Sequence, residues 1–267
     1  MVEPVLAVDN LLVEFRRKGG TQQVVRGVSF QLKPGQVLGI VGESGSGKSA
    51  TCLSILGLLG SEGRVSSGSI QLLQQELTQL KPEEMRKIRG KQISMIMQNP
   101  MSFFDPISTI GKHFVETSRT HQTLTKTEAK QVAVNHLLAV GLKNAKELLN
   151  QFPFQLSGGM LQRVMIAIAL SLNPKVLIAD EPTTALDVLT QVQILKLLAR
   201  LQQQHDMAIL LVTHDLGAIA QLADEVAVMY AGQFVEQTTV EALFDSPQHP
   251  YTRSLLASRP GSRISGR

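Results

Sequence analysis

The sequence is poor in the residues that build disulfides, metal centres and aromatic stacking sites. It contains a single cysteine, Cys52, no tryptophan, and only 4% aromatic residues. One cysteine cannot form an internal disulfide or provide a zinc or iron–sulfur site, so we expect Cys52 to be a small packing residue. With so few aromatic rings, no platform for stacking bases is evident, and we expect no nucleic-acid partner.

Long hydrophobic segments are also missing. The longest apolar runs, at 164–172 and 226–230, fall far short of the ~20 residues that are needed to span a bilayer. Glu3 and Asp9 interrupt the amino terminus, where a secretory signal would be apolar. The sequence therefore predicts a soluble, cytoplasmic chain. Its 267 residues, 43% of them hydrophobic, are enough for a large buried core, and its mild net charge of +4 suits a polyphosphate ligand.

Apolar runs alternate with segments of helical periodicity over much of the chain. Residues 6–15 and 24–32 read as strands joined by a turn at Gly19 and Gly20. Further apolar runs, each expected to be a strand, lie at 37–41, 93–97, 176–179, 209–212 and 226–229. Helical segments such as 48–59 and 188–204 separate them, which indicates a parallel sheet covered on both faces. The section from 99 to 165 breaks this alternation and reads as a helical insertion.

A glycine-rich segment follows the apolar run 37–41 directly. Residues 42–49, GESGSGKS, match the pattern G-x-x-x-x-G-K-[ST] at every fixed position, with a strand before and a helix after. In this pattern backbone N–H groups surround phosphate oxygens, Lys48 reaches the β- and γ-phosphates, and Ser49 holds Mg²⁺. The pattern predicts a nucleotide site formed by Gly42, Glu43, Ser44, Gly45, Ser46, Gly47, Lys48, Ser49 and Ala50.

Two carboxylates follow the apolar run 176–179. A buried strand there would bring Asp180 to the carboxyl edge of the sheet, beside the phosphate loop, where it can orient the Mg²⁺ shell. Glu181 is the next residue and could activate the attacking water as a general base. With the glycine-rich segment upstream, this pair indicates hydrolysis of a nucleoside triphosphate.

The segment 156–163, LSGGMLQR, lies between these motifs and resembles the signature of ATP-binding-cassette (ABC) ATPases. Other positions match the same family in the same order. Gln98 resembles the Q-loop glutamine, Asp187 belongs to a D-loop-like segment, and His214 resembles the switch histidine. Phe15 fits the aromatic residue that stacks on adenine in the family.

One position of the signature departs from the family. Met160 stands where the commonest signature has Gln. The change should matter little, because in the family the γ-phosphate is met by the residues that correspond to Ser157, Gly158 and Gly159. ABC ATPases work as head-to-tail dimers, so Ser157 of the signature would serve the nucleotide of a partner. The resemblance also assigns Asp187 to nucleotide binding.

The resemblance covers essentially the whole chain and implies its fold class, α/β. It implies a P-loop NTPase (RecA-like) core with an antiparallel β subdomain and an inserted α-helical subdomain. The single domain would have its core and β subdomain at about 1–98 and 166–245, its helical subdomain at about 99–165 and a family tail at about 246–267. The cofactors implied are ATP and Mg²⁺. The resemblance assigns catalysis to Lys48, Gln98, Glu181 and His214, and the contacts to Mg²⁺ to Ser49, Gln98 and Asp180.

Three classes of ABC ATPase compete at this point, and a transporter subunit is favoured. Lys48 and Ser157 are separated by only 109 positions, whereas DNA-repair and chromosome-structure members place a long coiled coil or zinc modules there. Translation-associated members normally carry two cassettes in one chain, and this chain carries one.

Within transporters, two segments resemble the dipeptide/oligopeptide/nickel importer family. They are MQNPMSFFDP at 97–106, which resembles its Q-loop, and HPYTRSLL at 249–256, which resembles its carboxyl-terminal motif. The chain stops at Arg267 without the cysteine cluster of many peptide-type members. This favours nickel or a metal–metallophore complex as cargo, with di- or oligopeptides as the alternative. The six histidines show no ligand spacing, so we expect no nickel binding by this subunit itself.

The partners implied are a second ABC ATPase subunit in a heterodimer, two transmembrane permeases and an extracytoplasmic solute-binding protein. The chain would then lie, as a peripheral protein, on the cytoplasmic face of the bacterial inner membrane.

Overall fold

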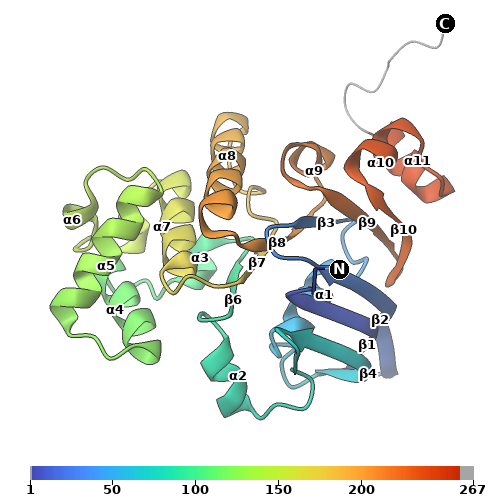
Figure 1. The fold of residues 1–267 in the computed structure, drawn as a ribbon, viewed down its shortest axis with the longest axis horizontal. Coiled ribbons are helices and arrows are strands. Elements are labelled where there is room, and N and C mark those ends of the chain that lie inside the picture. The colour runs from blue at the N-terminus through green and yellow to red at the C-terminus, as the bar shows by residue number, and fades with distance from the viewer. Residues whose placement is uncertain (1, 259–267) are drawn as a thin grey trace, which may run out of the picture. The chain divides into compact units, whose positions relative to one another are not determined.

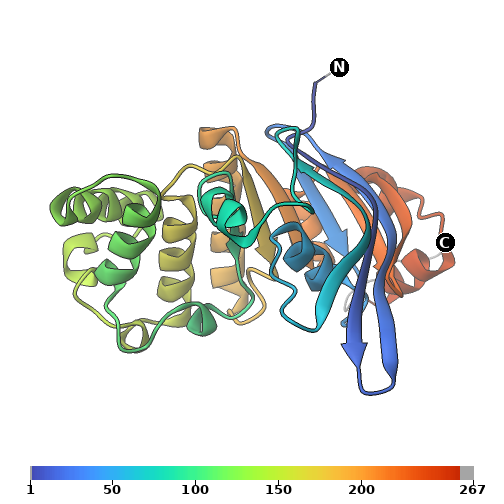
Figure 2. The same cartoon turned by 90° about the horizontal axis from the view of Figure 1, so that it is seen from below.

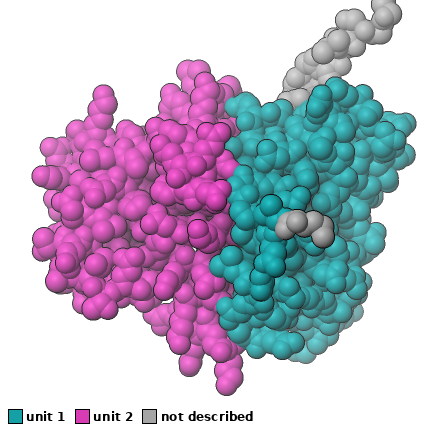
Figure 3. Space-filling view, viewed as in Figure 1, with its two compact units in different colours: residues 1–80, 210–267 teal, residues 81–209 magenta. Residues whose placement is uncertain are grey.

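The computed structural model describes residues 2–258, which divide into two compact units (Figure 3). Unit 1 comprises Met1–Leu80 and Leu210–Arg267, and unit 2 comprises Lys81–Ile209. The helical subdomain expected at about 99–165 lies within unit 2, and the expected division into subdomains stays a prediction. The end of the expected family tail, 259–267, lies outside the described residues.

Unit 1 contains an antiparallel sheet with the strand order β2-β1-β4-β5. Its strands are β1 (Leu6–Arg17), β2 (Gly20–Leu32), β4 (Gly63–Leu72) and β5 (Gln75–Glu76). The hairpin of β1 and β2, in blue in Figure 2, pairs Leu6 with Leu32 at one end and Arg17 with Gly20 at the turn. The expected strands at 6–15 and 24–32 are confirmed, and both are longer than predicted.

Four further strands of unit 1 lie in the order β10-β9-β3-β8. They are β3 (Val37–Val41), β8 (Ala208–Thr213, mostly in this unit), β9 (Glu225–Tyr230) and β10 (Gln233–Thr239). β3 and β9 run parallel, and β10 pairs antiparallel with β9. Every residue of β3 and β8 is buried, which explains why the sequence has continuous apolar runs there.

Among the helices of unit 1, one follows β3, one joins β8 to β9 and two follow β10. They are α1 (Lys48–Ile55), α9 (Leu216–Leu222), α10 (Val240–Asp245) and α11 (Pro250–Ala257). The helix expected at 48–59 therefore ends earlier, at Ile55. Cys52 in α1 is fully buried, as expected for a packing residue.

Unit 2 combines two parallel strands with a group of helices. Strands β6 (Ile93–Ile96) and β7 (Val176–Asp180) are paired with Ile96 opposite Ala179. The helices are α2 (Pro82–Ile88), α3 (Pro100–Phe103), α4 (Ile110–His121), α5 (Lys126–Ala139), α6 (Ala145–Leu148), α7 (Gly158–Leu170) and α8 (Val188–His205), with a 3₁₀ turn at Pro153–Gln155. Helix α5 packs against α4, α6 and α7 (Figure 1).

The section from 99 to 165, all of it described, is helical and has no strand, as the sequence predicts. The strand expected at 93–97 ends one residue earlier, at Ile96, so Gln98 lies in the loop beyond it. Among the described residues, no helix combines the length and the apolar character that crossing a bilayer requires.

Candidate nucleotide site

The phosphate loop, residues 42–49, joins β3 to α1 in unit 1. Two of its glycines are required by their surroundings. A Cβ atom on Gly42 would lie 2.1 Å from the carbonyl oxygen of Met229, at the end of β9. Gly47 precedes α1 with φ of 112°, and a Cβ atom there would lie 2.8 Å from the carbonyl oxygen of Val24. Only glycine fits these two positions, so the glycine spacing of the motif has a steric cause.

The loop presents hydrogen-bond donors that the protein itself does not use. Within residues 2–258, the backbone N–H groups of Ser44, Gly45 and Gly47 donate to no other group. The Ser46 hydroxyl is buried and also has no hydrogen-bond partner in this part of the chain. Unpaired N–H groups at the start of a helix form a site for an anion, so the loop fits a phosphate group.

Lys48 is folded back onto the same loop. Its side chain is buried, and Nζ donates to the carbonyl oxygens of Gly42 at 2.7 Å and Glu43 at 2.9 Å. These bonds hold a positive charge within the loop, where it can bind a phosphate oxygen.

His214 lies in the turn between β8 and α9, and it is exposed. Its two neighbours fix the backbone of this turn. The Thr213 hydroxyl accepts a hydrogen bond from the Asp215 N–H at 2.9 Å, and the Asp215 carboxylate accepts one from the Gly217 N–H at 2.7 Å. The side chain of His214 is therefore presented from a rigid turn.

Phe15 lies in β1 of the same unit. Its ring packs against the backbone of Gly63, where a Cβ atom would lie 2.8 Å from Phe15 Cε1. The Arg17 guanidinium lies 5.9 Å from the centre of the Phe15 ring. The close contact with Gly63 holds the aromatic ring in one place on the sheet.

Gln98 and Glu181 meet in unit 2. They follow β6 and β7, and the carboxyl ends of neighbouring parallel strands lie at the same edge of a sheet. Gln98 Nε2 donates to Glu181 Oε2 at 3.2 Å, and the Thr184 hydroxyl donates to the same oxygen at 2.6 Å. Asp180, the last residue of β7, is buried. The predicted base and the predicted Q-loop glutamine are thus direct partners.

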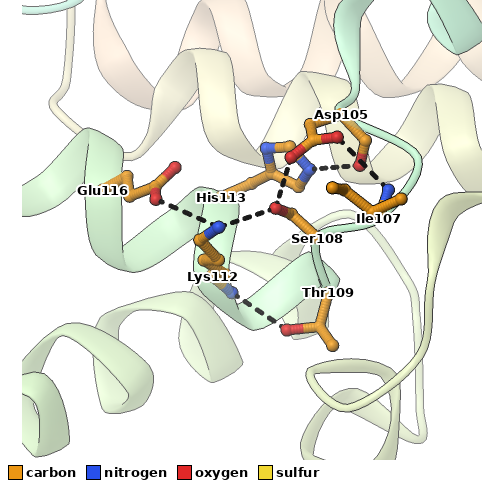
Figure 4. Close-up of polar contacts among 7 residues, drawn as sticks. All are labelled: Asp105, Ile107, Ser108, Thr109, Lys112, His113 and Glu116. Carbon is orange, nitrogen blue, oxygen red and sulfur yellow. Dashed lines mark hydrogen bonds and ion pairs between the residues drawn. The ribbon is translucent and has the colours of Figure 1, made fainter.

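The loop that begins at Gln98 ends in a polar cluster at the start of α4 (Figure 4). Asp105 accepts hydrogen bonds from the Ile107 N–H at 3.2 Å and from the Ser108 hydroxyl at 2.5 Å. The bonds from Ser108 and Ile107 lower the pKa of Asp105. Lys112 Nζ donates to the Ser108 hydroxyl at 2.9 Å, so the cluster ties the end of this loop to α4.

The signature segment and the D-loop lie together in unit 2. Ser157 caps α7, and its Oγ accepts a hydrogen bond from a backbone N–H of the first turn at 3.3 Å. A Cβ atom on Gly159 would lie 2.8 Å from Cγ2 of Thr190, in the first turn of α8. Asp187 caps α8 by accepting hydrogen bonds from the hydroxyl and the N–H of Thr190, which lower the pKa of Asp187. Ser157 and Gly158 are exposed.

The predicted site residues fall into two groups. Unit 1 holds Phe15, residues 42–50 and His214, and unit 2 holds Gln98, 157–159, Asp180, Glu181 and Asp187. Thr184 contacts Glu181 but was missed by sequence reasoning. Its only sequence signal is a hydroxyl three residues after a carboxylate, a spacing typical of turns. Within the described part of the chain, no cluster of three or more His, Cys, Asp or Glu side chains could hold a metal ion.

The α/β fold, the phosphate loop and the buried strand that ends in Asp180 and is followed by Glu181 are those of an ABC ATPase. Residues 25–184 match the model of the ABC transporter family, and the chain belongs to this family. It is an ATP-binding protein whose ATP hydrolysis serves transport.

The relatives of the chain include transport ATPases of similar sequence. The chain is 50% identical to the oligopeptide transport ATP-binding protein AppD of Bacillus subtilis, over 96% of this chain and 78% of the relative. It is 48% identical to the dipeptide transport ATP-binding protein DppD of the same organism, over 99% of this chain and 79% of that one.

A solved structure supports the fold. It is a dimeric, post-hydrolysis state of the ATP-binding cassette MJ0796 with ADP and phosphate bound. It matches with a TM-score of 0.77 and 27% identity, over 88% of this chain and 98% of that one.

Proposed function

We propose that this chain is the ATP-hydrolysing subunit of a bacterial ABC importer for di- or oligopeptides. The observation that carries this proposal is its similarity to AppD and DppD, which extends over nearly the whole chain at about half identity. The sequence alone favours nickel or a metal–metallophore complex as cargo. The names of these relatives favour the alternative, peptides, and none of the comparisons supports nickel.

We assign the chemistry to residues that the sequence predicts to bind or hydrolyse the nucleotide. Lys48 and the unpaired N–H groups of the phosphate loop bind the β- and γ-phosphates. Glu181 takes a proton from the attacking water, and the bonds from Gln98 and Thr184 support this role because they fix the carboxylate. His214 is assigned to the γ-phosphate of the same nucleotide.

The residues expected to meet Mg²⁺ fit this ion in their chemistry. Ser49, Gln98 and Asp180 offer hydroxyl, amide and carboxylate oxygens, which are the donors that Mg²⁺ prefers. When bound together with ATP, the ion would neutralise charge on the phosphates. The unpaired donors of the phosphate loop support the binding of phosphates by unit 1.

The remaining assignments concern other chains. Ser157, Gly158, Gly159 and Asp187 serve the nucleotide bound to a second ABC ATPase subunit. The exposure of Ser157 and Gly158 supports this role. Two permeases and an extracytoplasmic solute-binding protein complete the importer, and this chain lies on the cytoplasmic face of the bacterial inner membrane.

Uptake by living cells tests the proposal. Cells that lack the gene receive either the wild-type chain or Glu181→Gln, and uptake of a labelled dipeptide, a labelled oligopeptide and radioactive nickel is measured. We expect peptide uptake to return with the wild-type chain alone, at equal protein levels, and nickel uptake to be the same in both. If nickel uptake depends on Glu181 and peptide uptake does not, the transported substrate is nickel and the proposal of a peptide cargo is wrong.

A further inference from the structure

The carboxyl-terminal motif at 249–256 has no part in the function proposed above, yet its tyrosine contacts the phosphate loop. The backbone N–H of Glu43, the second residue of the loop, donates a hydrogen bond to the Tyr251 hydroxyl at 3.1 Å. Both residues belong to unit 1, and Tyr251 lies in the first turn of α11. The last described helix is therefore bonded directly to the loop that fits phosphate.

Several contacts hold Tyr251 in position for this bond. The Glu236 carboxylate, in β10, accepts hydrogen bonds from the N–H groups of Gln248 at 2.8 Å and His249 at 2.9 Å. His249 Nδ1 accepts one from the Tyr251 N–H at 3.2 Å, which caps α11. The ring of Tyr251 packs on that of Tyr230, with 4.4 Å between the ring centres. The hydroxyl, the ring and the backbone N–H of Tyr251 are thus each held by a separate contact.

The bond from Glu43 orients one particular peptide group. The Glu43 N–H and the Gly42 carbonyl belong to the same planar peptide, so they point in opposite directions. The N–H is held by Tyr251, while the carbonyl oxygen accepts a hydrogen bond from Lys48 Nζ at 2.7 Å. Tyr251 therefore fixes the peptide that in turn holds the ammonium group of Lys48.

Further contacts of the loop in this unit come from β2, where the Val24 carbonyl packs against Gly47, and from the β9–β10 hairpin. The Gly232 N–H donates to the Ser46 carbonyl at 2.9 Å, and the Met229 carbonyl packs against Gly42. None of these contacts involves the Glu43 N–H. Burial, the largest cause, and the nearby charge of Glu43 raise the pKa of Tyr251, so the hydroxyl that accepts this bond is neutral at physiological pH.

We propose that Tyr251 is a positioning residue for the phosphate loop, and that helix α11 thereby sets the affinity of the loop for nucleotide phosphates. This inference rests on the proposed role of residues 42–49 in binding those phosphates. It gives the carboxyl-terminal motif a function within this chain, which is to hold the Gly42–Glu43 peptide and, through it, Lys48.

The test compares two substitutions in neighbouring tyrosines, each of which removes the hydroxyl of one ring. Tyr251→Phe loses the acceptor for the Glu43 N–H and keeps the ring contact. Tyr230→Phe is the matched control, because among the described residues no group bonds to the Tyr230 hydroxyl. The dissociation constant of ADP and the hydrogen exchange of the Glu43 amide are measured on the full chain, with Lys48→Ala as a reference for loss of phosphate binding.

We expect Tyr251→Phe to weaken ADP binding by roughly 2- to 10-fold, the factor for one net hydrogen bond. Exchange of the Glu43 amide should become faster in the same variant, and Tyr230→Phe should match the wild type in both measurements. If Tyr251→Phe binds ADP and exchanges the Glu43 amide like the wild type, the proposal for Tyr251 is wrong. The assignment of the phosphate loop would not be affected by that result. If instead Lys48→Ala binds ADP like the wild type, the assignment of the phosphate loop fails, and the role of Tyr251 fails with it.

Discussion

Glu181 has a backbone conformation that few residues with a side chain adopt. Its φ of 48° lies in the left-handed region, which costs a non-glycine residue about 1–3 kcal/mol. This conformation turns the chain at the end of β7, where the carboxylate accepts hydrogen bonds from Gln98 and Thr184. The strained residue is thus the one to which we assign the activation of water.

Replacing the carboxylate of Glu181 tests that assignment. We expect Glu181→Gln to slow ATP hydrolysis by about 10²–10⁴-fold, because the variant keeps the size of the side chain and loses the base. ATP binding should be unchanged, since the phosphate loop is intact. Phosphate release and ATP affinity are measured on the purified protein, with Glu147→Gln, on the exposed part of α6, as control. Hydrolysis close to the wild-type rate would remove Glu181 from the role of base.

Thr184 allows a test of whether hydrolysis also requires the Glu181 carboxylate to be held in position. Thr184→Val keeps the shape of the side chain and removes the hydroxyl that donates to Glu181, whereas Thr184→Ser keeps the hydroxyl. We expect kcat to fall about 3- to 10-fold in the valine variant, the effect of losing one hydrogen bond at an exposed charged group. The serine variant should stay near the wild-type kcat. Equal kcat values for the two variants would show that this hydroxyl does not position the base.

The contacts of Glu181 and Glu43 differ in how far the sequence could predict them. Gln98 and Glu181 each follow an apolar run, and strands of that kind are expected to end at one edge of a parallel sheet. The contact between Glu43 and Tyr251 joins residues that are 208 positions apart. It depends on how β9, β10 and α10 lead the chain back to the phosphate loop, and no local pattern encodes that path.

Whole strands also differ in how far the sequence could predict them. All residues of β7 are buried, so the strand coincides with a visible apolar run in the sequence. In β4 only two of ten residues are buried, and Ser and Gly fill its centre. The position of β4 is defined by its pairing with β1, for example Leu6 opposite Leu72. Strands that rely on a partner in this way carry little signal of their own.

Helices α7 and α8 begin against each other, which explains the second glycine of the signature. We expect Gly159→Ala to destabilise the protein by about 1–3 kcal/mol, because its methyl group would overlap Cγ2 of Thr190. Thr190 cannot easily turn away, since its hydroxyl donates to Asp187 at 2.7 Å. The gain in helix propensity from glycine to alanine, about 1 kcal/mol at most, does not offset this overlap.

A second substitution separates the overlap from other effects of Gly159→Ala. Thr190→Ser removes the methyl group and keeps the hydroxyl bond to Asp187, so the double variant should recover most of the lost stability. Thermal unfolding of the wild type, both single variants and the double variant gives the coupling free energy between positions 159 and 190. Additive effects of the two substitutions would mean that this contact does not cause the destabilisation.

The start of α8 also presents apolar side chains to solvent. Val188 and Leu189, directly after Asp187, are 73% and 77% exposed, and Ser157 is exposed at the start of α7. Exposed apolar residues next to polar motif residues are typical of a surface that another chain covers. This surface supports the proposal that the signature and the D-loop act on the nucleotide of a partner subunit.

ATP-dependent association tests that proposal for the assembled protein. In the Glu181→Gln background, where ATP is retained, we expect ATP but not ADP to shift the sedimentation of the chain from monomer to dimer. The γ-phosphate supplies contacts that only the closed dimer can make. If the chain requires a different ATPase subunit as partner, the shift is expected only when that subunit is added.

A second substitution, Ser157→Arg, should abolish the shift and leave ATP binding unchanged, because the bulky side chain blocks the signature. Thr127→Arg, at an exposed position of α5, is the matched control. A dimer that forms equally well with Ser157→Arg would exclude the signature from the interface and contradict the head-to-tail arrangement.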